Sequence, residues 1–78
     1  MREKTLRLVV TFHTTTAAMA MERYCTEQQI PGRIIPVPRE ITAGCGLAWS
    51  APPDVRPEIE RAAAAISAAV DGYYELVI

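Results

Sequence analysis

Apolar and polar positions alternate over residues 5–12 (TLRLVVTF), which is typical of a β-strand. Leu6, Leu8, Val10 and Phe12 fall on one face, and we expect helices to cover them. The other face carries Thr5, Arg7, Val9 and Thr11 and is expected to be wetter. Three further short segments rich in β-branched or aromatic residues predict strands: residues 33–37 (RIIPV), 45–51 (CGLAWSA) and 73–78 (YYELVI).

Residues 13–29 change to a helical spacing. Their apolar stripe consists of Ala18, Met21, Cys25 and Gln28. Any of the three threonines at 14–16 can cap the helix, because a hydroxyl there accepts a hydrogen bond from a free amide. Pro31 and Gly32 are expected to stop this helix.

A second helix is expected to begin near Pro57, which suits the first turn, and Glu58 is favourable near the positive end of the helix dipole. The apolar positions that follow have helical spacing: Ile59, Ala62, Ala63, Ile66, Ala69 and Val70. We expect Gly72 to close the helix in the left-handed conformation.

The element order strand, helix, strand, strand, helix, strand predicts an α+β domain of the ferredoxin-like βαββαβ type. Such a domain has a four-stranded antiparallel sheet with two helices on one face. Its second and fourth strands lie at the edges, where Pro36 is tolerated because it donates no ladder hydrogen bond. The chain has 78 residues, so we expect residues 1–78 to form one domain.

Charge and composition narrow the class of protein. The formal net charge is −1 and the basic residues are scattered, which argues against nucleic acid or a membrane surface as the partner. The sequence has no secretory signal and no apolar run that would span a membrane, so we expect a cytoplasmic protein with reduced cysteines. One histidine and two distant cysteines lack the spacing of a zinc site, so no metal is expected.

Antiparallel pairing of the first and third strands predicts a cluster at one rim of the sheet. The end of the first strand, with His13 and Thr14, would lie beside Cys45, and Arg39 lies in the loop that leads there. Positive charge and helix N-terminal amides favour the thiolate of a cysteine, which is its reactive form. Gly44 and Gly46 flank this cysteine and would leave its sulfur accessible. The cluster suits a nucleophile or a carrier of bound sulfur.

A purely structural interpretation of the same residues stays open. Cysteine is among the most buried residue types, and the two glycines could serve only a turn or a bulge. His13 and Arg39 could be solvated, and Trp49 is expected in the core or an interface. Cys25 lies on the apolar stripe of the first helix, too far along it for a disulfide with Cys45, and is expected to be a buried thiol.

Nearly the whole chain resembles a small bacterial family described as selenium/sulfur carrier-like. The resemblance rests on residues 10–49, above all on Pro38-Arg39 followed by Cys45-Gly46 in PREITAGCGLA. Members of the family commonly have small hydroxyl residues before the cysteine; Thr42 is kept here, but alanine and Gly44 follow it. The resemblance implies that Cys45 carries a persulfide or selenide and needs no cofactor.

Two functions are therefore considered. The first is a carrier, rather than a turnover enzyme, that receives sulfur or selenium on Cys45 from a cysteine desulfurase-type donor or another relay protein and passes it on. The second is a non-catalytic binding or assembly module in which Cys45 is structural. Either protein could form a homodimer through the apolar edge at residues 73–78 or through the open face of the sheet.

Overall fold

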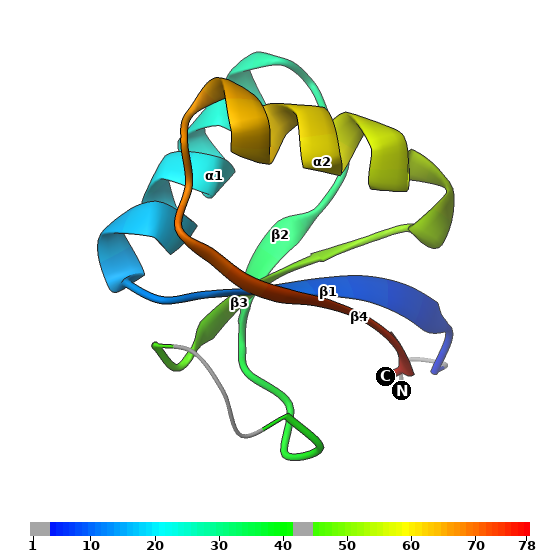
Figure 1. The fold of residues 1–78 in the computed structure, drawn as a ribbon. Coiled ribbons are helices and arrows are strands. Elements are labelled where there is room, and N and C mark those ends of the chain that lie inside the picture. Colours follow the sequence, from blue (N-terminus) through cyan, green and yellow to red (C-terminus); the bar gives the residue numbers. More distant parts are fainter. Residues whose placement is uncertain (1–3, 42–44) are drawn as a thin grey trace.

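The computed structural model describes residues 4–41 and 45–78. The elements follow one another in the predicted order, with one added turn of 3₁₀ helix (Figure 1). They are β1 (Leu6–Phe12), α1 (Thr15–Glu27), β2 (Arg33–Pro36), β3 (Leu47–Ala51), the 3₁₀ turn η1 (Pro53–Val55), α2 (Arg56–Ala65) and β4 (Val70–Val77).

The four strands form one antiparallel sheet in the order β2-β3-β1-β4. Both helices lie on the same face of this sheet (Figure 1). The chain is therefore an α+β domain with the ferredoxin-like arrangement, as the sequence predicts. Pro36 lies on β2 at one edge of the sheet, which confirms the placement derived from its missing amide.

The main core lies between the sheet and the helices. Leu8, Val10 and Phe12 point from β1 toward the helices and are fully buried. They pack in one cluster with residues of β3 and both helices, which include Met21, Trp49 and Ile59. Leu6, which shares their face, is 48% exposed, so the helices cover only the later part of the strand.

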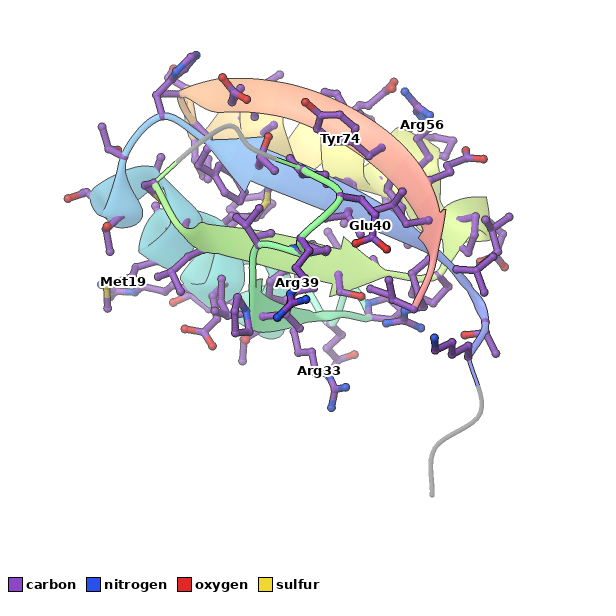
Figure 2. The ribbon with its side chains drawn as sticks, turned by 90° about the horizontal axis from the view of Figure 1, so that it is seen from below. Met19, Arg33, Arg39, Glu40, Arg56 and Tyr74 are labelled. Atoms are coloured by element: carbon purple, nitrogen blue, oxygen red, sulfur yellow. The ribbon has the colours of Figure 1, made fainter. Side chains whose placement is uncertain are left out.

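The open face of the sheet is less wet than the alternation of β1 predicts. Val9 and Thr11 are both fully buried. A turn closed by the amide of Ile41, which donates to the carbonyl of Pro38 (3.0 Å), lies over this face (Figure 2). Ile41 packs there with Val9 and Ala48 in a second cluster, against which five half-buried residues pack: Ile35, Val37, Tyr74, Leu76 and Ile78.

The helices start as expected but end earlier. Thr14 is the N-cap of α1. That helix ends at Glu27, before Pro31 and Gly32, and Gln28 is an exposed C-cap rather than part of the buried stripe. Gln29 then adopts a left-handed conformation, with φ of 58°.

The prediction that Gly72 closes the second helix is wrong. The helix ends at Ala65, and Ser67 takes the left-handed conformation with φ of 52°. Val70 and Gly72 belong to β4 instead, which is longer than expected. β3 in turn begins at Leu47, so Cys45 precedes the strand.

Candidate functional site

Cys45 lies at the rim of the sheet where β1 ends. Its amide donates to the carbonyl of Phe12 (2.9 Å), so the backbone there is tied to the end of the central strand. The thiol is half-buried and packs at the border of the helix-side core. Its Sγ donates to the carbonyl of Leu47 over 3.8 Å. The sulfur therefore has a backbone partner, while the residue as a whole is partly exposed.

Cys25 provides the contrast. Its side chain is fully buried, as the sequence predicts, and its Sγ lies 3.5 Å from the Sδ of Met21. Burial raises the pKa of the Cys25 thiol from 9.0 to about 11, because the thiolate would lose its hydration. This thiol is disfavoured as a nucleophile in the folded protein.

Gly46 gives the backbone beside Cys45 its direction. Its φ is +97°, a region that residues with a side chain rarely adopt. Its carbonyl accepts a hydrogen bond from the amide of Val37 (3.0 Å), and a Cβ built at this position would meet only open space. The positive φ angle therefore favours glycine at this position, and the space where a side chain would stand is open. Gly44 lies outside the described residues.

His13 and Thr14 follow the strand end to which Cys45 is tied. The Thr14 hydroxyl accepts a hydrogen bond from the amide of Ala17 (3.1 Å), so it caps α1. The Nδ1 atom of His13 lies 3.5 Å from Oδ1 of Asp71, and the Thr11 hydroxyl donates to the other carboxylate oxygen (3.2 Å). This partner comes from β4, on the opposite side of β1 from β3.

The sequence did not point to Asp71 as a partner of the histidine. It precedes Gly72, which the sequence predicts to close the second helix. In the structure the β1–β4 register shifts between Thr11 and Phe12, and Asp71 falls at this irregularity. A shift of register is a tertiary feature with no signal in the spacing of apolar residues.

Arg39 is exposed in the turn that covers the open face of the sheet (Figure 2). Ile41, at the end of that turn, packs on the open face, whereas Cys45 packs with the helix-side core. The described structure therefore associates Arg39 and the thiol with opposite faces.

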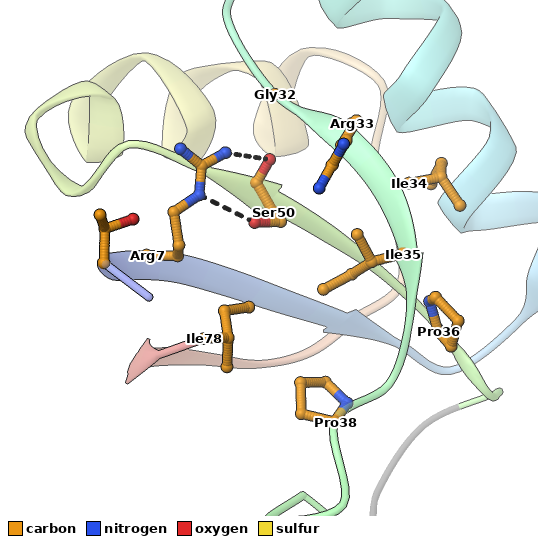
Figure 3. Close-up of a pocket in the computed structure, with 10 residues that line it drawn as sticks. Arg7, Gly32, Arg33, Ile34, Ile35, Pro36, Pro38, Ser50 and Ile78 are labelled. Atoms are coloured by element: carbon orange, nitrogen blue, oxygen red, sulfur yellow. Dashed lines mark hydrogen bonds between the residues drawn. The ribbon is translucent and has the colours of Figure 1, made fainter. Parts of the chain in front are cut away.

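A separate groove crosses the open face next to β2 (Figure 3). It encloses about 840 Å³ and contains neither Cys45 nor Arg39 in its lining. Its charged lining residues are Arg7, which donates to the hydroxyl (3.1 Å) and carbonyl (3.4 Å) of Ser50, and Arg33. The remaining lining residues are Thr5, Gly32, Ile34, Ile35, Pro36, Pro38 and Ile78.

Two further properties concern the described residues as a whole. Over residues 4–41 and 45–78, histidine, cysteine and acidic side chains form no group that could hold a metal ion. None of the helices in this part of the chain has the length and apolar character needed to cross a membrane.

The fold and the thiol place the chain among ferredoxin-like α+β domains with one half-exposed cysteine at the rim of the sheet. Within this class the chain belongs to the family described as "Putative Se/S carrier protein-like", whose model matches residues 7–75. The match includes β1 from Arg7 onward, both helices and Cys45, and confirms the resemblance seen in the sequence. Neither the curated proteins nor the solved structures contain a match to this chain.

Proposed function

We propose that this protein carries sulfur or selenium as a persulfide or selenylsulfide on Cys45. The proposal rests on the family match and on the difference in burial between the two thiols. Cys45 is half-buried at the rim, whereas Cys25 is enclosed in the core with a raised pKa. Of the two cysteines, only Cys45 is partly exposed, and its sulfur is therefore the one that we propose a second protein reaches.

The transfer needs no external oxidant or reductant. The thiolate of Cys45 attacks the outer sulfur of a donor persulfide, and the sulfur–sulfur bond of the donor breaks. A new sulfur–sulfur bond forms on Cys45, the donor leaves as a thiolate, and the proton lost by Cys45 neutralises it. An acceptor nucleophile then attacks the same outer sulfur, and Cys45 is released as a thiol.

The surroundings of Cys45 support binding of the anionic forms. Helix α1 begins shortly after Phe12, whose carbonyl holds the Cys45 amide, and the N-terminus of a helix favours negative charge. Gly46 leaves open space through which a donor chain can approach. In this proposal Thr14 keeps the helix end in place, and His13, next to the strand end to which Cys45 is tied, lines the rim that the donor approaches.

We propose that Arg39 contacts a partner protein rather than the sulfur. Because its turn packs on the open face, we assign it no contact with the sulfur. Its exposed guanidinium instead suits contact with an acidic surface of a cysteine desulfurase or another relay protein in the cytoplasm.

The test is the intact mass of the protein after incubation with a cysteine desulfurase and cysteine. We expect a gain of one sulfur atom that a thiol reductant removes. Cys45→Ser should abolish the gain, and Cys25→Ser, the matched control, should retain it. An adduct that persists in Cys45→Ser contradicts the proposal. Replacing the donor system with a selenocysteine lyase and selenocysteine distinguishes selenium from sulfur by the mass gained.

The groove on the open face favours a second candidate, a binding module in which Cys45 is structural. The groove presents Arg7 and Arg33, and none of its described lining residues is acidic. This lining suits an extended segment with acidic and apolar side chains.

Trp49 offers a readout for this candidate. Gly32 lines the groove and its backbone lies against the Trp49 ring, within 2.5 Å of which a Cβ would fall. Acidic peptides bound there should change the tryptophan fluorescence, and the double change Arg7→Ala with Arg33→Ala should weaken the response. If Cys45→Ser binds such peptides normally and wild type gains no sulfur, the binding module replaces the carrier.

A further inference from the structure

The two edge strands of the sheet differ in how they resist pairing with another chain. In the β2–β3 ladder Val37 donates to the Gly46 carbonyl (3.0 Å), and the residues opposite each other alternate between bonded and non-bonded pairs. Pro36 therefore belongs to a non-bonded pair, and its backbone nitrogen faces away from β3. Because proline has no amide hydrogen, this nitrogen cannot donate to a further strand. This proline blocks the β2 edge.

The β4 edge has no such block. Thr5 and Ile78 exchange backbone hydrogen bonds (3.2 and 3.1 Å), so they form a bonded pair. Bonded and non-bonded pairs alternate along an antiparallel ladder, so the amides and carbonyls of Tyr73, Glu75 and Val77 point away from β1. The strand Val70–Val77 contains neither proline nor lysine, the residues that commonly protect an edge. Leu6 and Val77, which lie opposite each other at its end, are 48% and 59% exposed.

Charge and regular pairing together select how a second copy of β4 fits against this edge. In a two-fold antiparallel pair, residues whose backbones face outward must oppose one another, which limits the possible registers. A pair centred on Tyr73 brings the irregularity at Asp71 opposite Glu75, so only residues 72–74 keep regular pairing. A pair centred on Glu75 places two glutamates opposite each other, a like-charge contact that destabilises a sheet. A pair centred on Tyr74 avoids both problems.

The Tyr74-centred register pairs residues 72–76 of the two copies and stops before the irregularity at Asp71. It places Tyr73 opposite Glu75. Arg56 already lies with its Cζ 5.4 Å from the centre of the Tyr73 ring and its Nη1 3.4 Å from a carboxylate oxygen of Glu75. In this register Arg56 therefore lies near Glu75 of its own chain and near Glu75 of the second copy.

We propose that two copies of this chain associate along β4, antiparallel, with Tyr74 at the two-fold axis. The sheets of the two copies become continuous, and the apolar open faces join through Tyr74 and Leu76. The sheet order places β3, which follows Cys45, on the other side of β1 from the interface. The dimer therefore leaves the thiol of each copy accessible.

Light scattering of the purified chain over the micromolar to millimolar range tests the association. We expect a dimer, and a monomer throughout this range overturns the proposal. Glu75→Pro removes an outward amide that would pair with Tyr73 of the second copy, without removing a bond to β1. It should raise the dissociation constant by about tenfold or more. The matched control Glu75→Ala also lacks the carboxylate but keeps the amide, and should dimerise more tightly than Glu75→Pro; equal dissociation constants overturn the proposal.

If Glu75→Pro fails to fold, as circular dichroism would reveal, Tyr74→Asp replaces it. In the proposed register residue 74 faces residue 74 of the second copy, so two aspartates would oppose each other and weaken the dimer. The matched control Tyr74→Asn is nearly isosteric but uncharged and should dimerise more tightly than Tyr74→Asp. Equal dissociation constants overturn the register.

Cross-linking tests the register independently of affinity. In a Cys45→Ser background, Tyr74→Cys should form a disulfide-linked dimer under mild oxidation, because directly opposed residues in a non-bonded pair have Cα atoms about 4.5 Å apart. Leu76→Cys, on the same face, should not, since it faces Gly72 of the second copy. Cross-linking through position 76 but not 74 overturns the arrangement. None of these measurements depends on sulfur transfer.

Discussion

Gly32 and Gly46 both have a positive φ angle, but their surroundings differ. Gly32, with φ of +144°, lies against Trp49 so closely that a Cβ would fall 2.5 Å from the indole ring. Gly46, with φ of +97°, faces open space. A side chain at the first position meets both backbone strain and a clash, whereas at the second it meets strain alone.

The two Gly→Ala substitutions should therefore differ in cost. Gly32→Ala should lower the free energy of unfolding by about 3 kcal/mol, since the large indole is held in the core. Gly46→Ala should lower it by about 1 kcal/mol. Urea unfolding followed by circular dichroism measures both values. Equal losses would show that the Trp49 contact does not restrict residue 32.

The two thiols should differ in reactivity. We expect iodoacetamide at neutral pH to label Cys45 at least about tenfold faster than Cys25, because the latter is fully buried and has a raised pKa. Peptide mapping after timed quenching gives the two rates. The same experiment in denaturant is the control, and there the difference should largely disappear. Faster labelling of Cys25 in the folded protein would remove the physical basis of a carrier role for Cys45.

Cys25 also predicts how stability depends on pH. Its pKa is raised from 9.0 to about 11, so between these values the unfolded chain releases this proton while the folded chain retains it. The contribution to stability is fully present below pH 9 and is lost as the pH rises through about 11. Burial also raises the pKa of Tyr73, with the same sign.

The control for this pH dependence is Cys25→Ala. It should decline less steeply with pH than wild type over the same interval, whatever its stability at neutral pH. Urea unfolding at several pH values provides the comparison. Parallel declines would mean that the thiol is not desolvated in the native state.

At the scale of elements, the spacing of apolar residues and the position of Pro36 predicted the strands and helices better than Pro31, Gly32 and Gly72 predicted the helix ends. The strand character of β1, the helical stripe through Met21 and Cys25, and the edge position of Pro36 agree with the structure, although both faces of β1 are buried at Val9 and Thr11. The helix ends do not, because Gln29 and Ser67 adopt the left-handed conformation that is usually associated with glycine. Local sequence carries little information about such ends when tertiary contacts decide them.

The candidate site could be predicted only in part. Antiparallel pairing correctly brings the residue 45 backbone to the end of β1, because this follows from topology. The partner of His13 and the face on which Arg39 lies depend on a register shift and on a turn. Neither feature leaves a periodic pattern, so neither could be derived from the spacing of residues.

The turn over the open face should contribute to stability as an element of the fold. Ile41 is 7% exposed and packs on Val9 and Ala48. Ile41→Ala should lower the free energy of unfolding by about 2 kcal/mol. Glu40→Ala, in the same turn but exposed, should change it little. Equal effects of the two substitutions in urea unfolding would indicate that the turn does not cover the sheet in solution.

At the scale of the whole molecule, β1 holds the sheet together because it pairs with both β3 and β4. A chain shortened to end at Ser67 lacks β4 and should remain unfolded by circular dichroism. A synthetic peptide of residues 68–78 added to it should restore strand signal, because the missing strand supplies the second neighbour of β1. A folded shortened chain would show that three strands and the helices suffice.

The pairing of β1 with β4 has a consequence for biosynthesis. β1 precedes β4 by more than fifty residues in the chain, so it finds its second neighbour only after β4 has been translated and has left the exit tunnel. At roughly 5–20 residues per second, this wait lasts seconds, during which the apolar residues of β1 remain open to other nascent chains. We therefore expect the native sheet to be completed only after β4 has been translated, and any earlier contact of β1 with another chain competes with its own pairing.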